Sequence, residues 1–196
     1  DREIFMLEDL AQVFDMDRIN KSSAAFSFDK LLWLNGEHIR LLSEEAFHAL
    51  ALKYYPESVR HIDLTRISQL IHPRLEKLTD IPVMVSFMAE LPAYDVALFE
   101  NQKSRSTLDS SRKVLKETLP LLESLAEWSN ETLFETLKAY AQEQGLKLGT
   151  VMWPIRTALS GLPSTPGGAT ELADLLGRQK TLLRLHTGLV KLQAAE

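Results

Sequence analysis

The chain has 196 residues, of which 45% are hydrophobic and 25% charged, with a net charge of −5 and no cysteine. This composition is ordinary for a globular protein with one sizeable core or two small cores in series. The absence of cysteine excludes disulfides and thiolate zinc sites, and no apolar run approaches the length of a membrane span. The acidic balance also argues against a generally basic nucleic-acid binder.

Charge is unevenly distributed along the chain. Residues 1–137 carry 15 Lys and Arg against 23 Asp and Glu, a net charge of −8, whereas residues 138–196 carry 7 against 4, a net charge of +3. A positive end on an acidic protein is typical of a local surface for a polyanion. A chance fluctuation in surface charge is the alternative that composition alone leaves open.

Helical spacing of apolar residues extends through most of the first half, and each expected helix has a start or stop signal. The first expected helix is capped by Ser43 and ended by Pro56, with Phe47, Leu50, Ala51 and Tyr54 on its apolar face. The next is opened by Asp63 or Thr65 and interrupted by Pro73, which would begin a new turn over 74–78 as its first residue. A further helix is expected over 83–88, starting at 80–82.

The second half is also helical, with a break at 91–95 and a polar stretch at 101–106. We expect a helix over 108–128 that Pro120 kinks or divides, a helix capped by Ser129 and closed by Gly145, two helices closed by Gly161 and Gly177, and a last helix over 181–192. Strand patterns are nearly absent, so the sequence predicts an all-α fold. Boundaries near Leu41 and Ser104 divide it into segments 1–41, 42–103 and 104–196.

Two sequence blocks carry a family resemblance. The first is LKLGTVMWPIRTALSG at 146–161, followed by STPGG at 164–168, and the second comprises RINKS at 18–22, FDKLLWLNG at 28–36 and Ile39-Arg40. The first block resembles the anticodon-reading end of bacterial glutamyl-tRNA synthetase, and the second is similar to that family's segment beneath the catalytic domain. The resemblance runs, with gaps, from about residue 2 to residue 185.

The resemblance implies elongated helical bundles in series. Segment 1–41 would contact the tRNA stem, and segments 42–103 and 104–196 would form two anticodon-binding subdomains. The parent enzyme would be cytoplasmic and would use ATP and magnesium to load glutamate onto tRNA(Glu), whereas no cofactor is expected in this chain. Its expected partners are tRNA(Glu) and its own catalytic domain, with no membrane and no need for more than a monomer. Because the sequence lacks an initiator Met and a catalytic half, we interpret it as a piece of that enzyme.

Arg74, in HPRL at 72–75, matches the family position that reads the third anticodon base. The glutamate anticodon ends in C and the glutamine anticodon in G. Cytosine offers the acceptors N3 and O2, whereas guanine offers N1–H and N2–H donors, and arginine has only donors. An arginine placed there should therefore accept C and reject G. The alternative is a surface arginine paired with Glu76 or Asp80.

Arg156, Thr165 and Pro166 match positions that the family uses around the first and second anticodon bases. We expect Arg156 early in a helix that Pro154 starts or bends, donating to a base carbonyl or a phosphate. Thr165 would supply a hydroxyl and Pro166 an apolar platform. Gly168 stands where the family has a bulky apolar residue, which removes a stacking surface. The alternative for 164–168 is an ordinary turn with a helix cap.

Other basic residues match family positions that contact the tRNA backbone or stem. Lys138 and Lys147 would touch phosphates, which fixes register without reading sequence. Lys30 and Trp33 lie one helical turn apart and resemble a stem contact, although for Trp33 we favour core packing beneath Asn35-Gly36. Three cations near the end of the chain would extend the footprint or simply be solvated: Arg178, Lys180 and Arg184.

Several features predict no chemistry of their own. RINKS at 18–22 superficially resembles an ATP-binding loop of this enzyme class but lacks the partner motif and sheet, so we expect no ATP binding. The five histidines have no metal-ligand spacing, and we predict no catalytic residue and no metal site. Core positions are expected for Phe87, Met88, Met152 and Trp153. An alternative function is an all-helical protein-interaction module whose acidic first 137 residues bind a basic partner.

Overall fold

The computed structural model describes residues 3–19 and 25–195, with Arg18 described by its backbone only. Within these ranges the chain forms ten α-helices and short 3₁₀ turns, and its only β-type pairing is an isolated bridge between Asn101 and Ser106. The prediction of an all-α fold is confirmed. No helix in the described part is long and apolar enough to cross a membrane.

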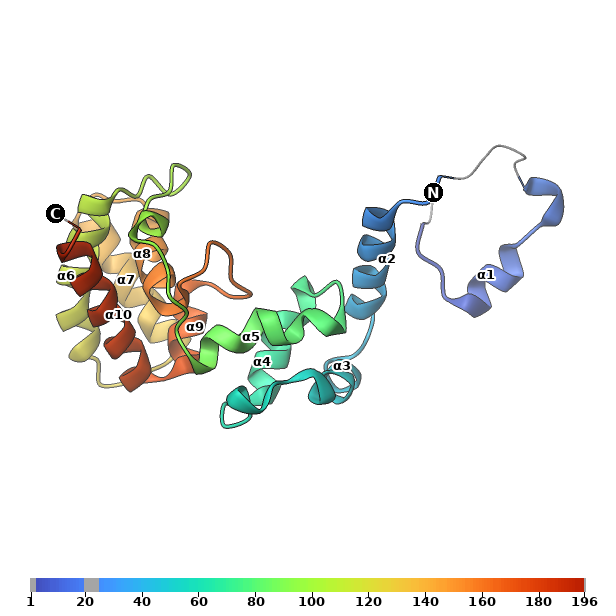
Figure 1. Cartoon of the computed structure of the whole chain (residues 1–196), viewed down its shortest axis with the longest axis horizontal. Coiled ribbons are helices and arrows are strands. Elements are labelled where there is room, and N and C mark those ends of the chain that lie inside the picture. The colour runs from blue at the N-terminus through green and yellow to red at the C-terminus, as the bar shows by residue number, and fades with distance from the viewer. Residues whose placement is uncertain (1–2, 20–24, 196) are drawn as a thin grey trace.

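The molecule is elongated, with three groups of helices in a row (Figure 1). One end holds α1 (Leu7–Val13) and α2 (Phe28–Arg40). The middle unit contains α3 (Glu44–Ala51), α4 (Leu64–Ile71) and α5 (Ile81–Ala89). The other end, the C-terminal unit, is a bundle of five helices: α6 (Leu108–Glu123), α7 (Asn130–Glu143), α8 (Leu148–Ser160), α9 (Ala169–Leu176) and α10 (Arg178–Gln193).

The first segment buries little of its apolar surface. Leu7 is 83% exposed and Phe28 67% exposed, and α2 buries only Gly36 and Ile39. Trp33 is 37% exposed, so the core-packing interpretation of this residue is wrong. Residues 20–22 of the RINKS block lie outside the described residues.

Side-chain caps start α3 and α4 of the middle unit where the sequence predicts them. The Ser43 hydroxyl accepts a hydrogen bond from the amide of Ala46, and the Asp63 carboxylate accepts bonds from two amides of the first turn of α4. Short 3₁₀ turns connect these helices and lead out of the unit: Leu52–Tyr54, Glu57–Val59, His72–Arg74, Leu78–Asp80 and Val96–Phe99.

The expectation that Pro73 begins a new helical turn over 74–78 is wrong. Pro73 lies in the 3₁₀ turn His72–Arg74, which continues directly from α4. The chain then becomes extended at Leu75, with φ −82° and ψ 132°, and the Leu75 side chain is fully buried. Arg74 therefore lies at the end of α4 and its 3₁₀ turn, and not at the start of a following helix.

In the C-terminal unit, the predicted start and stop of α7 and the predicted stop of α8 at Gly161 are confirmed, but two internal prolines behave differently from expectation. Helix α6 continues through Pro120 undivided and ends at Glu123, short of the expected 128. Helix α8 begins at Leu148, so Pro154 lies inside it and Arg156 lies in its third turn. Because Val151, Ile155 and Ala158 bury one side of α8, packing offsets the hydrogen bond that Pro154 lacks.

Candidate nucleic-acid interface

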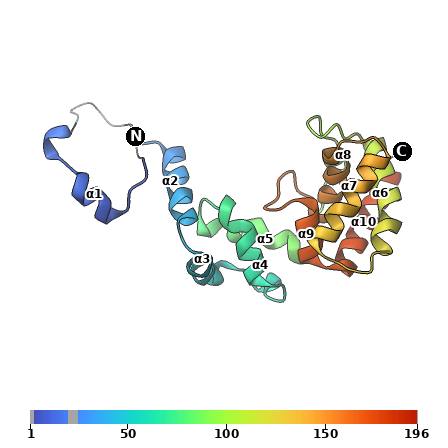
Figure 2. The same cartoon turned by 180° about the vertical axis from the view of Figure 1, so that it is seen from behind.

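The centre of the candidate site is the α8–α9 loop, residues 161–168. It projects from the C-terminal unit toward the middle unit in both views (Figure 1, Figure 2). Arg156 holds this loop: one terminal nitrogen of its guanidinium donates to Thr165 Oγ1 and the other to the carbonyl of Pro163, both at 3.0 Å. Thr165 Oγ1 in turn donates to the carbonyl of Gly167 at 2.7 Å. Arg156 and Thr165 are thus brought into direct contact.

Beside the loop lies the Trp153 pocket, a depression of about 400 Å³. The Arg156 guanidinium lies over the Trp153 ring, 4.4 Å from its centroid, and the indole N–H donates to the carbonyl of Leu98 at 2.9 Å. The core prediction for Trp153 is therefore wrong, whereas Met152 lines the pocket but also packs against the core as predicted. Burial lowers the pKa of Arg156 from its usual value, but arginine remains charged at neutral pH. The pocket is lined by Ser104, Asn130, Phe134, Gly149, Met152, Trp153, Arg156, Gly168, Ala169, Thr170 and Glu171.

On its other side the loop forms one wall of the Arg74 pocket, a depression of about 410 Å³. Arg74, Val83 and Met84 of the middle unit line it opposite residues 162–166. The Arg74 guanidinium donates to the carbonyl of Leu70 at 3.2 Å and is exposed, while Asp80, one of its expected partners, pairs with Lys77 at 3.2 Å. Arg74 and Arg156 therefore border the same loop from two different units.

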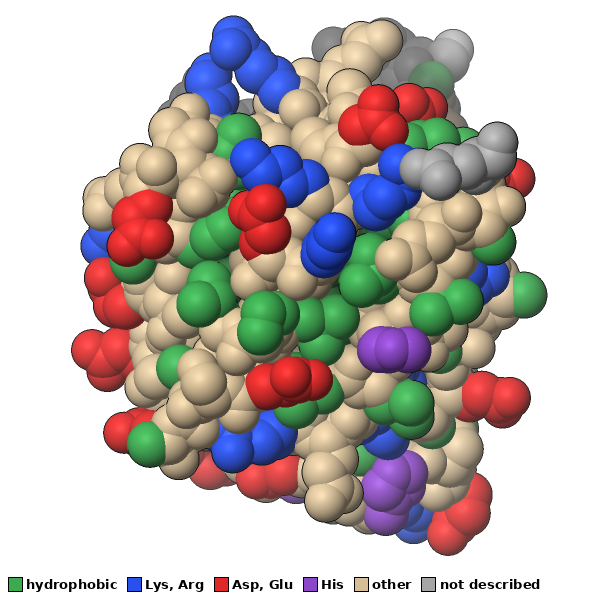
Figure 3. Space-filling model, turned by 90° about the vertical axis from the view of Figure 1, so that its left-hand side faces the viewer, with side chains coloured by type: hydrophobic (Ala, Val, Ile, Leu, Met, Phe, Trp, Pro, Cys, Tyr) green, Lys and Arg blue, Asp and Glu red, His purple; other side chains and the backbone are tan. Residues whose placement is uncertain are grey.

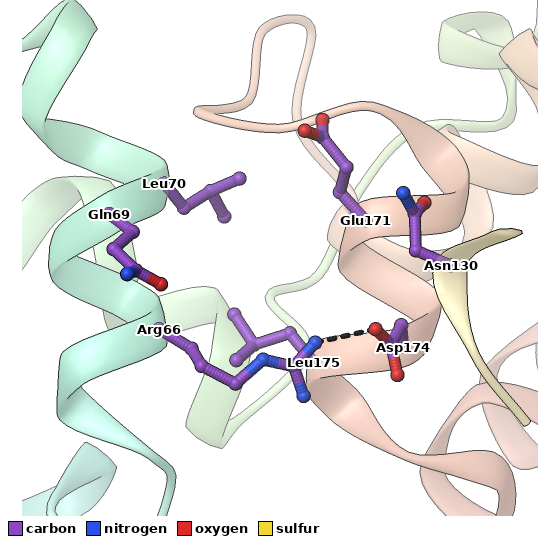
Figure 4. A pocket seen from close by; sticks show the side chains of 7 residues that line it. All are labelled: Arg66, Gln69, Leu70, Asn130, Glu171, Asp174 and Leu175. Atoms are coloured by element: carbon purple, nitrogen blue, oxygen red, sulfur yellow. Dashed lines mark hydrogen bonds and ion pairs between the residues drawn. The ribbon is translucent and has the colours of Figure 1, made fainter.

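A third depression, the seam pocket, lies where α4 meets α9 and has a volume of about 220 Å³. Figure 4 shows Arg66 of α4 reaching across to Asp174 of α9, with the ion pair at 2.5 Å. Asn130 and Glu171 line both this pocket and the Trp153 pocket, so the two depressions adjoin. The three pockets and the α8–α9 loop, together called the strip, span the middle and C-terminal units.

Glycines allow the loop to approach its neighbours closely. A Cβ atom at Gly167 would lie 2.7 Å from Leu70 Cδ1, a distance that would force Leu70 to move. Gly168 precedes α9, and its amide donates to the Glu171 carboxylate at 2.7 Å. A Cβ there would meet only that carboxylate, at 3.3 Å, so the side of Gly168 that faces the pocket is open.

Comparison with known proteins identifies the family. The family described as "Anticodon binding domain" matches residues 46–189. The chain belongs to this family. The resemblance that the motifs predict is confirmed.

Relatives of this anticodon-binding domain include the glutamate–tRNA ligases of Clostridium tetani, 45% identical over 97% of this chain, and of Clostridium acetobutylicum, 43% identical over 97%. The chain spans 39% and 40% of the length of these two proteins. A crystal structure of a glutamate tRNA ligase from Elizabethkingia meningosepticum, in complex with its amino acid, has the same fold with a TM-score of 0.73. That likeness, at 24% identity, covers 94% of this chain and 36% of the other.

The remaining predicted contacts of the anticodon-binding domain lie in separate places. Lys138 of α7 pairs with Glu135 at 3.0 Å and lies over the ring of Phe134, which lines the Trp153 pocket. Lys147 is exposed just before α8. Lys30 and Trp33 are on α2, away from the loop (Figure 1), and Lys30 lies 3.7 Å from Glu3.

The positive excess at the end of the chain is largely structural. Besides Arg156, four of its seven cations donate to backbone carbonyls: Arg178 to Leu125, Lys180 and Arg184 to Met88, with Arg184 also reaching Leu159, and Lys191 to Tyr94. Both interpretations of Arg184, a footprint cation or a solvated one, are wrong, because it is only 5% exposed. At the end of the molecule formed by this unit, acidic and basic side chains are interspersed (Figure 3).

Sequence reasoning missed several residues of the strip. Trp153 precedes Arg156 by three positions, which places both on one face of a helix, so this pair was detectable from spacing. Arg66, Asn130 and Glu171 come from three different helices, and only the tertiary structure brings them together in the seam pocket.

Proposed function

We propose that this domain binds the anticodon loop of a glutamate tRNA as part of a glutamate–tRNA ligase. The observation that carries the proposal is the strip, in which a loop held by Arg156 faces Arg74 from the neighbouring unit. Unstacked loop bases are recognised by hydrogen bonds to their edges and by flat groups that stack on them. Arginines beside an aromatic ring on a concave surface supply both kinds of contact.

Arg74 is the proposed reader of the third base. Its exposed guanidinium borders a pocket with an apolar floor, and its free donors match the two acceptors of a cytosine edge. Opposite guanine they would leave donors facing donors. The hydrogen bond to Leu70 restrains the side chain, which limits the entropy lost when a base binds.

Arg156, Thr165 and Pro166 are the proposed contacts for the first two bases. A guanidinium has five N–H donors, of which the loop contacts above account for two, so donors remain for a base carbonyl or a phosphate. The open side of Gly168 leaves room in the Trp153 pocket, and we predict looser selection of the first base than a bulky residue would give. Lys138 and Lys147 are proposed phosphate contacts, and Lys30 and Trp33 proposed stem contacts.

We assign the remaining activities to the parent ligase. Glutamate activation with ATP and magnesium would belong to its catalytic domain, in a cytoplasmic monomer, and this chain would contribute recognition only. Separated from that domain, the chain should bind tRNA more weakly, since linked sites gain affinity through effective concentration.

The test is filter binding of tRNA(Glu) and of the same tRNA with its third anticodon base changed from C to G. We expect Arg74→Gln to reduce the preference for C by about 1–3 kcal/mol, because glutamine offers both a donor and an acceptor. The control is Lys116→Gln on α6, an exposed cation on a different helix, which removes the same charge and should leave the preference unchanged.

Salt dependence separates this function from a protein-interaction module. Binding to tRNA phosphates should weaken steeply as the salt concentration rises, because binding releases counterions from the RNA and their release is less favourable in high salt. A module that docks a basic protein predicts no tRNA binding, or binding without preference for the third base. An unchanged preference in Arg74→Gln would show that Arg74 is not the reader.

A further inference from the structure

Arg184 occupies an unusual position for a charged residue. It lies on α10 and is 5% exposed. One terminal nitrogen of its guanidinium donates to the carbonyl of Leu159, and the other donates to the carbonyl of Met88 at 3.4 Å. Lys180, one turn earlier on the same helix, donates to Met88 at 3.2 Å. A buried arginine with two backbone partners in different units is a fixed connection between them.

Both accepting carbonyls belong to the last turns of helices. Met88 precedes the last residue of α5, and Leu159 precedes the last residue of α8. The final carbonyls of a helix have no partner within it and carry the negative end of the helix dipole, so a cation there is stabilising. Burial lowers the pKa of Arg184 and of Lys180, and the neighbouring Arg184 charge lowers the pKa of Lys180 further.

The two helices that Arg184 joins carry the two sides of the candidate site. Val83 and Met84 of α5 line the Arg74 pocket, and Arg156 lies on α8 three residues before Leu159. Besides the Lys180 contact with Met88, the units share the Arg66–Asp174 ion pair, which is partly exposed, with Arg66 at 45%. Exposed ion pairs contribute little to stability because water and salt screen them, so the buried hydrogen bonds of Arg184 are the stronger restraint.

We propose that Arg184, assisted by Lys180, is a positioning residue that fixes the middle unit against the C-terminal unit, so that Arg74 and Arg156 read one RNA loop together. The part that concerns RNA rests on the proposed function. The part that concerns the arrangement of the two units does not, and it is measured without RNA.

The arrangement is measured by pulsed electron paramagnetic resonance. Because the chain has no cysteine, Glu57→Cys in the middle unit and Lys116→Cys in the C-terminal unit give two unique attachment points for spin labels. Both positions are exposed. We expect one narrow distance distribution, and a broadened or shifted one when Arg184→Met is added.

Arg112→Met is the matched control. Arg112 donates to the carbonyl of Leu192, also near a helix end, at 3.2 and 3.0 Å, but both residues belong to the C-terminal unit. It should leave the distance distribution unchanged. Lys180→Met removes only one donor to Met88 and provides a second, milder variant if Arg184→Met does not fold. Unchanged distributions in the folded variants would overturn the proposal.

The same proteins without labels are then tested for tRNA binding. We expect the preference for C over G at the third base to fall by about 10-fold in Arg184→Met, as for a lost base contact, and to persist in Arg112→Met. If both Arg184→Met and Arg112→Met only lowered the melting temperature, the preference for C would not differ between them. A broadened distribution with an unchanged preference would overturn the role in reading. If even the unsubstituted chain fails to bind tRNA, the proposed function fails, and the distance distribution alone decides whether Arg184 sets the arrangement.

Discussion

The end of α8 provides a quantitative test of the structure. Gly161 has φ 63°, in the left-handed region, and its amide donates to the carbonyl of Thr157 at 2.8 Å. A Cβ atom there would lie 2.7 Å from Cδ1 of the buried Tyr94 ring and 3.2 Å from Cγ of Pro92. Gly161→Ala therefore combines about 1–2 kcal/mol of backbone strain with about 1–3 kcal/mol of overpacking, about 2–5 kcal/mol in all.

Gly145 supplies the matched control for this substitution. It closes α7 with the same φ of 63°, but nothing lies within 4 Å of its potential Cβ. Gly145→Ala should therefore cost only the strain, about 1–2 kcal/mol. Urea denaturation followed by far-ultraviolet circular dichroism measures both free energies of unfolding, and their difference isolates the contact with Tyr94.

Equal destabilisation of the two variants, within about 0.5 kcal/mol, would refute the close approach of the Tyr94 ring. No destabilisation in either would refute the left-handed conformation. Combining Gly161→Ala with Tyr94→Leu should cost less than the sum of the two single substitutions, because the smaller side chain leaves space for the added methyl group.

Two further predictions concern buried hydroxyl groups. The Tyr94 hydroxyl is buried without a hydrogen-bond partner among the described residues, so Tyr94→Phe should change the free energy of unfolding at neutral pH by less than about 1 kcal/mol. Burial raises the pKa of Tyr94 from 10.0 to about 12. The stabilisation from the buried neutral hydroxyl is therefore fully present below pH 10 and should be lost between pH 10 and 12. Alkaline denaturation followed by circular dichroism should show a smaller decline over this range in Tyr94→Phe. Ser68 Oγ lies 2.8 Å from both the Tyr55 hydroxyl and His48 Nδ1, and Ser68→Ala should cost about 1–3 kcal/mol in urea denaturation. The exposed Ser86→Ala is its control, expected within about 0.5 kcal/mol of the parent.

Helix starts and stops were predictable because their causes are local. Ser43, Asp63 and Ser129 each cap an amide two or three residues ahead, and Gly145 and Gly161 adopt the left-handed conformation that ends a helix. Such interactions involve neighbours in sequence and need no knowledge of the fold. The all-α class and the family motif followed from the same local patterns.

The errors arose where distant segments change the outcome. Pro154 lies inside α8 because buried neighbours hold the helix against the core, and Trp153 lines a pocket because α7 and α9 leave space beside it. The sequence could not show that Arg184 would be buried, since its partners Met88 and Leu159 are 96 and 25 residues away.

The candidate site illustrates the same division. The sequence by itself was enough to select Arg74, Arg156, Thr165 and Pro166 as candidates, because they stand in recognisable local motifs. Only the tertiary structure decided that the α8–α9 loop brings Arg74 and Arg156 to one surface. The physical reason is that this arrangement depends on contacts between units. Arg66, Gly167 and Arg184 each contact a partner at least 96 residues away, and such contacts leave no periodic signal in the chain.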